Sequence, residues 1–169
     1  MKNNYLKIIS KYFNKKEFIK NNLNKIINVR YGFNNIKTIR MIKSKEFQDF
    51  YNQHLTQSYL KTTYKEVWKK EEKSLNEACK NKFRADNDIG SQICRYWQLL
   101  SGKFMPSKIM GKYYEISNNN SKIINAIKKR KYKIICINDA KANIDFEKAK
   151  KEINTAFEKT FVEKSSFEK

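Results

Sequence analysis

Five residues are the candidates for proton transfer or for binding of phosphate or a ligand: His54, Arg84, Asp88, Asn138 and Asp139. His54 is the single histidine, and it lies in the polar stretch DFYNQHLTQSYL. Imidazole is the side chain best suited to move protons near neutral pH, so His54 is a candidate general base. The alternative is an incidental residue, because a lone histidine in a loop usually has no catalytic role.

Arg84 and Asp88 lie in the stretch NKFRADNDIGSQICRYWQLLSGKFMP, residues 81–106. A guanidinium is a planar fork of donors that matches phosphate oxygens, and Arg84 falls where one predicted helix ends and the next begins. Backbone N–H groups at that point could share the anion. The alternative is a surface ion pair with Asp86 or Asp88. Asp88 could orient an imidazole, hold a divalent ion, or cap the next helix together with Asp86 and Asn87.

Asn138 and Asp139 close the stretch YKIICIND, residues 132–139. Its β-branched and aromatic residues predict a buried strand that delivers polar side chains at its C-terminal end. Open α/β folds keep their ligand sites at such strand ends. Both residues could therefore bind a ligand, orient a partner or only terminate the strand.

Apolar residues at helical spacing predict the elements that must position these side chains. Residues 5–27 predict two basic amphipathic helices broken near Asn14, which pack on a core or lie on anionic lipid. A turn at Gly32 opens a stretch that we expect to be mostly loop up to Gln57. Further helices are predicted over residues 58–80, through residues 93–100 up to Ser101 and Gly102, after the 118–121 loop, and over residues 145–161. We expect one domain, and no linker or repeat is evident.

The composition excludes several classes of protein. The chain has 37 Lys and Arg against 17 Asp and Glu, a formal net charge of +20, which fits solvated lysine faces or a surface for polyanions. Its 40% hydrophobic content, with 11 Phe and 10 Tyr, is too high for a disordered basic tail. The three widely spaced cysteines favour reduced, mostly buried thiols over disulfides or a zinc site. We find no secretion signal and no membrane span, and therefore expect a cytoplasmic protein.

Several segments together resemble a known family. HLTQSYLKTTYKEVWKKE, NKFRADNDIGSQICRYWQLLSGKFMP, ICINDA and FEKTFVEKSSFE are similar to the third and fourth conserved regions of the Stealth proteins. These are bacterial capsular-polysaccharide phosphotransferases, to which the animal lysosomal-enzyme N-acetylglucosamine phosphotransferase is also similar. The resemblance covers roughly residues 29–168, and the order and spacing of the segments make it specific.

The resemblance implies an enzyme that moves hexose 1-phosphate from a nucleotide-sugar to a hydroxyl of an acceptor sugar, leaving a phosphodiester. His54 matches the family's histidine and would act as general base on the acceptor hydroxyl or on the transferring phosphoryl. Arg84 would clamp the diphosphate. Asp88, also a candidate catalytic residue, would orient partners or help to hold a divalent ion. Asn138 and Asp139 would bind substrate, and Asp139 is also the candidate ligand for a divalent metal, Mg²⁺ or Mn²⁺.

The resemblance also implies a larger whole. The family's first and second conserved regions, which resemble its nucleotide-sugar and metal-binding half, are not found. We therefore expect the C-terminal half of a phosphotransferase domain, of α/β class (α+β-like), predominantly helical with a few short strands. It would be incomplete and inactive alone, with the N-terminal half as a partner. Its parts would be a basic helical segment at 1–28 and the phosphotransferase part at 29–169, with the third region at about 50–106 and the fourth at about 132–168. Val162 stands where the family has proline.

A rival interpretation is a non-enzymatic basic module that binds nucleic acid or anionic membrane. It rests on the net charge of +20 and on the amphipathic N-terminal helices. The phosphotransferase interpretation instead predicts a nucleotide-sugar and a polysaccharide acceptor as partners, and it does not require nucleic acid. It is compatible with peripheral association at the inner face of the membrane.

Overall fold

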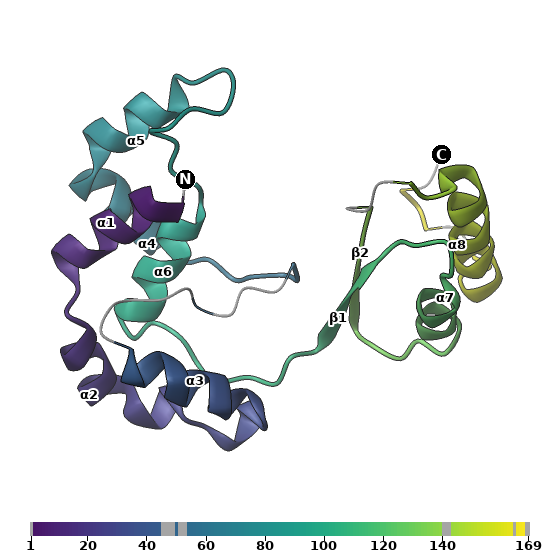
Figure 1. The fold of residues 1–169 in the computed structure, drawn as a ribbon, viewed down its shortest axis with the longest axis horizontal. Coiled ribbons are helices and arrows are strands. Elements are labelled where there is room, and N and C mark those ends of the chain that lie inside the picture. The colour runs from purple at the N-terminus through teal and green to yellow at the C-terminus, as the bar shows by residue number, and fades with distance from the viewer. Residues whose placement is uncertain (1, 45–49, 51–53, 140–142, 164, 168–169) are drawn as a thin grey trace. The chain divides into compact units, whose positions relative to one another are not determined.

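The computed structural model of the protein describes residues 2–44, 50, 54–139, 143–163 and 165–167. The chain divides into two compact units, which the sequence did not predict (Figure 1). The helical unit comprises Met1–Asn52 and Gln57–Lys108, and the βαβ unit comprises Gln53–Thr56 and Ile109–Lys169. The family-based boundaries at residues 28 and 29 remain a prediction.

The helical unit is built around α6, which is formed by part of the arginine-containing stretch 81–106. Trp97 of α6 is buried, and its ring lies 4.8 Å from the ring of Tyr12 and 5.0 Å from that of Phe13. Ile9 and Val67 are fully buried in the same core. The elements of this unit are α1 (Lys2–Tyr12), α2 (Lys15–Ile26), a 3-10 turn η1 (Val29–Tyr31), α3 (Asn34–Lys43), α4 (Lys61–Lys70), α5 (Glu72–Cys79) and α6 (Gln92–Leu100).

The two predicted N-terminal helices are confirmed as α1 and α2, and the break between them has a local cause. The side chain of Asn14 caps α2 by accepting hydrogen bonds from the backbone N–H groups of Lys16 and Glu17. The inner faces of both helices contribute buried residues to the core, as the packing alternative expected. Gly102, with φ of 69°, follows the end of α6 where the sequence predicted a stop.

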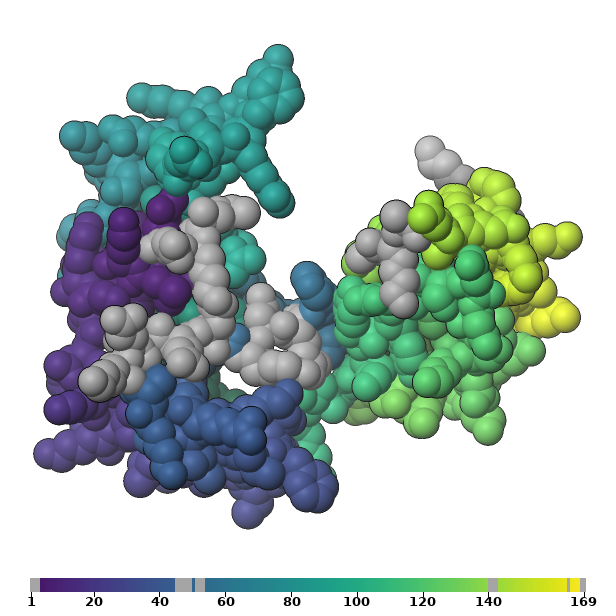
Figure 2. Space-filling view, viewed as in Figure 1, coloured from purple at the N-terminus to yellow at the C-terminus, as the bar shows by residue number. Residues whose placement is uncertain are grey.

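Two expectations for this unit were wrong. The stretch expected to be loop contains α3, which lies at the surface of the helical unit (Figure 2); residues 45–49 and 51–53 of that stretch lie outside the described residues. The helix predicted over residues 58–80 is divided at Glu71, which has non-helical φ and ψ angles. The Glu71 carboxylate is buried and accepts hydrogen bonds from the hydroxyl groups of Tyr12 and Ser74, so tertiary contacts reorient the chain there.

The βαβ unit confirms the predicted strand as β2 (Ile134–Asn138) and adds an unpredicted strand, β1 (Gly111–Glu115). The two strands are parallel and are connected through α7 (Ser121–Lys128), and α8 (Phe146–Thr160) packs on α7. Both helices lie on one face of the strands, over Tyr114, Ile135 and Ile137 (Figure 1). The fold class is confirmed, because the protein is mostly helical with a two-stranded parallel sheet among the described residues.

None of the helices in the described part of the chain combines the length and the apolar character that a bilayer span requires.

Candidate active site

His54 lies in the βαβ unit, because the short segment 53–56 associates with that unit and not with its neighbours in sequence. Its ring centroid is 5.2 Å from that of Tyr113 on β1, with an angle of 34° between the planes. The next residue, Leu55, lies against Gly111. A Cβ atom at Gly111 would lie only 2.9 Å from a Leu55 methyl carbon and 2.8 Å from the carbonyl oxygen of Ile134. The absent side chain at Gly111 therefore lets the histidine segment approach the strand.

Asn138 meets the same tyrosine from the neighbouring strand. Its side-chain amide donates a hydrogen bond of 3.0 Å to the Tyr113 hydroxyl. In the register of the sheet, Tyr113 is paired with Cys136, and Glu115 is paired with Asn138. Successive side chains of a strand point to opposite faces, so these four residues share the face opposite α7 and α8. The structure thus brings His54 and Asn138 together through Tyr113.

Asp139 follows β2 directly and is exposed. Because β1 and β2 are parallel and in register, their carboxyl ends, at Glu115 and Asn138, lie at the same edge of the sheet. That edge is where the sequence predicted polar ligand-binding groups. Among the described residues, no group of three or more His, Cys, Asp and Glu side chains is arranged to hold a metal ion. A metal at Asp139 would need further ligands, so this assignment remains a prediction.

Arg84 and Asp88 belong to the helical unit, in the loop between α5 and α6. The Asp88 carboxylate accepts hydrogen bonds from the Asn81 side-chain amide, at 2.8 Å, and from the Ala85 backbone N–H, at 3.1 Å. These two hydrogen bonds, with a smaller contribution from the charge of Arg84, lower the pKa of Asp88. Asp88 therefore stays ionised to lower pH than an ordinary aspartate, and it ties the loop around Arg84.

The predicted helix cap at residues 86–88 is wrong. Helix α6 begins at Gln92, and Ser91 at its N-cap position makes no side-chain capping bond among the described residues. The physical reason is that both oxygens of Asp88 are used inside the loop, three residues before Ser91. In addition, the side-chain amide of Asn4 on α1 donates to the backbone carbonyl of Asp88, at 3.0 Å, which fixes the loop on the helical core.

Arg84 itself is exposed, and no ion pair joins it to Asp86 or Asp88 among the described residues. Arg84 lies on a loop that the hydrogen bonds of Asp88 and Asn4 hold together. Whether Arg84 of the helical unit and His54 of the βαβ unit act on the same phosphoryl group remains a prediction.

Sequence reasoning missed Tyr113, the residue that links His54 to Asn138. Its strand, GKYYE, has only two aromatic residues as a local signal, and it lies in a stretch where no element was predicted. Two adjacent tyrosines after a glycine could have indicated a short strand, because aromatic residues are enriched in strands. The prediction of mostly buried thiols also needs correction, because Cys79 is exposed and Cys136 is only partly buried, whereas Cys94 is buried.

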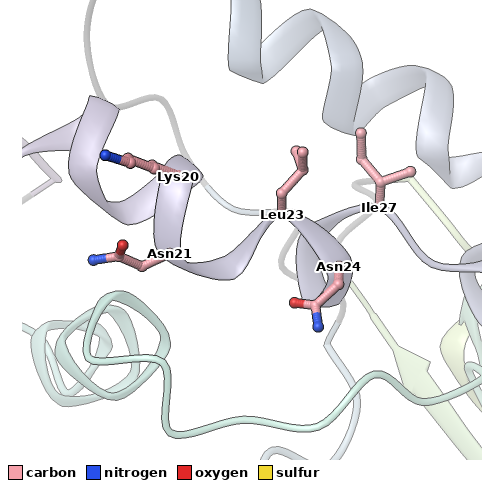
Figure 3. Close-up of a pocket in the computed structure, with 5 residues that line it drawn as sticks. All are labelled: Lys20, Asn21, Leu23, Asn24 and Ile27. Carbon is pink, nitrogen blue, oxygen red and sulfur yellow. The ribbon is translucent and has the colours of Figure 1, made fainter.

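A shallow pocket runs along α2 and is lined by Lys20, Asn21, Leu23, Asn24 and Ile27 (Figure 3). None of the predicted site residues lies in it. The candidate chemistry is therefore on the strands of the βαβ unit and on the Arg84 loop, and not in this pocket.

Comparison with known proteins gives the class of protein to which these residues belong. The chain is a homologue of the capsular and exopolysaccharide phosphotransferases. It is 46% identical to the capsular polysaccharide phosphotransferase WcwK of Streptococcus pneumoniae over 167 residues, which are 98% of this chain and 50% of that protein. The resemblance found in the sequence is thereby confirmed.

Two further relatives extend the comparison. The exopolysaccharide phosphotransferase cps2G of Lactiplantibacillus plantarum is 32% identical over 168 residues, and the receptor polysaccharide phosphotransferase WefC of Streptococcus gordonii is 29% identical over 167 residues. Each match covers 98% of this chain and 50% of the relative. The chain thus spans about half the length of the curated relatives it matches. No family model and no solved structure matches the chain.

Proposed function

We propose that this chain forms part of a sugar-1-phosphate transferase of capsular or exopolysaccharide synthesis. The observation that carries the proposal is the contact of both His54 and Asn138 with Tyr113, on the helix-free face of the sheet. The substrates would be a nucleotide-sugar and a hydroxyl of an acceptor sugar. The names and sequences of the relatives support a phosphotransferase, and the polar groups at the strand ends support binding of the donor.

In the proposed reaction, the acceptor oxygen attacks the phosphorus that carries the sugar. A new O–P bond forms, the P–O bond to the nucleoside monophosphate breaks, and the product is a sugar phosphodiester. His54 takes the proton of the acceptor hydroxyl, and the leaving nucleotide takes the electron pair of the broken bond. Arg84 neutralises the negative charge that grows on the leaving group. Asn138 and Asp139 hold the donor at the strand ends.

Asp88 and Tyr113 would act indirectly, by positioning the residues that contact the substrates. By accepting hydrogen bonds from Asn81 and Ala85, Asp88 fixes the loop that carries Arg84. Tyr113 would hold the His54 ring on one side and the Asn138 amide on the other. Mg²⁺ or Mn²⁺ bound at Asp139 remains part of the proposal, with further ligands expected from the other half of the relatives' length. A cytoplasmic location at the inner face of the membrane is also part of it.

The other half of the relatives' length would supply further substrate-binding groups, so we expect little turnover by residues 1–169 alone. The test compares residues 1–169 with a chimera in which they replace the matched half of pneumococcal WcwK. Both are assayed with nucleotide-sugars and capsule oligosaccharides in the presence of Mg²⁺ or Mn²⁺. Robust turnover by residues 1–169 alone would refute the need for the other half.

The roles of single residues are tested in the chimera. We expect His54→Ala to lower kcat by about 10²–10⁴-fold, the range of general base catalysis. Tyr113→Phe keeps the ring beside His54 and removes the hydroxyl that holds the Asn138 amide, so we expect a raised KM for the donor and a smaller fall in kcat than with His54→Ala. Tyr132→Phe, in the same unit but away from His54, is the matched control. Turnover that is insensitive to His54→Ala would exclude this residue as the base.

A further inference from the structure

The turn between α2 and α3 exposes apolar side chains to solvent. Val29 of η1 and Phe33 are each 92% exposed. The corner is nevertheless ordered by its own hydrogen bonds. The Asn35 side-chain amide donates to the carbonyl oxygens of Asn28, at 2.9 Å, and Gly32, at 3.1 Å, and its oxygen accepts from the Asn28 N–H at 3.2 Å. Val29 and Phe33 therefore project from a fixed turn.

The outer face of α3 continues this apolar surface. Ile36 and Ile39 are 53% and 43% exposed, whereas Met41 and Ile42 on the inner side pack against the core. Helical spacing places Ile36, Ile39 and the exposed Arg40 on the same side, with Phe33 one turn before Ile36. The α3 residues are visible at the surface of the unit (Figure 2). We call Val29, Phe33, Ile36 and Ile39 the apolar corner.

The charges around the apolar corner have one sign. Residues 28–43 contain no acidic residue, and they contain the basic residues Arg30, Lys37, Arg40 and Lys43. The exposed Leu23 of α2 and Ile27, which follows α2, line one pocket together with Lys20 (Figure 3). Apolar side chains flanked by Lys and Arg, without acids, are the composition of a surface that lies on anionic lipid.

We propose that the apolar corner docks the helical unit on an anionic bilayer surface. Val29 and Phe33 enter the boundary between headgroups and acyl chains, and Arg40 and Lys43 contact lipid phosphates. A bilayer fits better than a protein surface, because side chains this exposed on a convex turn can insert among lipids without a complementary pocket. For α1 and α2 the sequence left core packing and lipid binding as alternatives; their inner apolar faces contribute to the core, and α3 carries the exposed surface.

The test uses residues 1–169 and vesicles of either phosphatidylglycerol with phosphatidylcholine or phosphatidylcholine alone. We expect cosedimentation with the anionic vesicles that weakens as salt is raised. The double variant Val29→Ser/Phe33→Ser should lower the partition coefficient at least about tenfold, because two apolar side chains no longer leave water. Phe83→Ser/Met105→Ser, at two other highly exposed positions of the same unit, is the matched control and should bind like the wild type.

A second measurement reports insertion directly. The fluorescence of Phe33→Trp should shift to the blue when anionic vesicles are added, and brominated lipid should quench it, whereas Phe83→Trp should show neither effect. Absence of vesicle binding, equal binding to neutral vesicles, or equal loss of binding in the Phe83→Ser/Met105→Ser control would overturn the proposal. The last result would mean that exposed apolar side chains in general, and not the apolar corner, hold the chain on the vesicle. None of these outcomes depends on transferase activity.

Discussion

The helical unit and the βαβ unit bury different kinds of side chain. The core of the helical unit is rich in aromatic pairs, such as Tyr5 with Tyr96 at 5.1 Å between centroids, and Trp97 is almost fully buried in it. The core of the βαβ unit is aliphatic, formed by Ile123, Ile127, Ile153 and Ala156, and every residue of β2 remains partly exposed. The helical unit therefore forms a closed core, while the strands that carry Tyr113 and Asn138 keep a partly open face.

The largest loss of stability is expected from a substitution at Trp97, and it tests whether the two cores are independent. Trp97→Ala removes the centre of the aromatic core and the hydrogen bond of 2.9 Å that the indole N–H donates to Glu66. We expect it to lower the free energy of unfolding by about 3–5 kcal/mol, measured by urea denaturation followed by circular dichroism. Trp68→Ala, at an exposed position on α4, is the matched control and should cost much less.

Hydrogen exchange locates the effect of Trp97→Ala. Loss of protection should be concentrated in α1, α4 and α6, whose residues surround the indole. An equal loss in α7 and α8 would show that the two cores unfold as one, which would contradict the contrast drawn between the units.

The rates at which the cysteines are alkylated provide a second test of the difference between the closed helical core and the open strands. Burial in the helical core raises the pKa of the Cys94 thiol to about 11, from an ordinary value of 9.0. The thiolate is the reactive form, so at pH 8 Cys94 should react with iodoacetamide about a hundredfold more slowly than an ordinary thiol. Cys136 on β2 and the exposed Cys79 should be labelled first, as mass spectrometry of peptides would show. Rapid labelling of Cys94 would indicate that the helical core opens readily.

The smallest effect concerns two helix starts, one in each unit. The side chain of Asp145 caps α8 by accepting a hydrogen bond of 3.0 Å from the Lys148 N–H, whereas Ser91 makes no such bond at α6 among the described residues. Asp145→Ala should therefore cost about 1 kcal/mol, and Ser91→Ala should cost less, in the same urea titration. Equal costs would mean that the cap on α8 contributes nothing in solution.

Sequence periodicity predicted the elements whose apolar face meets the core. Helices α1, α2, α6 and α8 were found this way, because residues such as Ile9 and Trp97 recur at helical spacing and are buried. Helix α3 was missed, because Gly32 and the asparagines after it predict a turn followed by a loop. The break at Glu71 depends on a hydrogen bond from Tyr12, more than fifty residues away, which no local pattern contains.

The candidate site was predicted in its residues but not in its contacts. His54 and Asn138 were named from the sequence, yet their link runs through Tyr113 on a strand that forms only by pairing with β2, about twenty residues further along the chain. Asp88 shows the same limit. Its carboxylate was expected to begin a helix, and it ties a loop instead, because Asn81 and Ala85 provide donors that precede it in sequence.

The position of the candidate base, His54, depends on Gly111, a residue that has no functional group. A methyl group at Gly111 would collide with Leu55 and with the Ile134 carbonyl. The imidazole next to Leu55 can therefore lie where it does only because Gly111 has no side chain. A survey that ranked residues by chemical reactivity would pass over this position. One added carbon atom at Gly111 would displace Leu55, and with it the candidate base, while every polar group of the candidate site stayed unchanged.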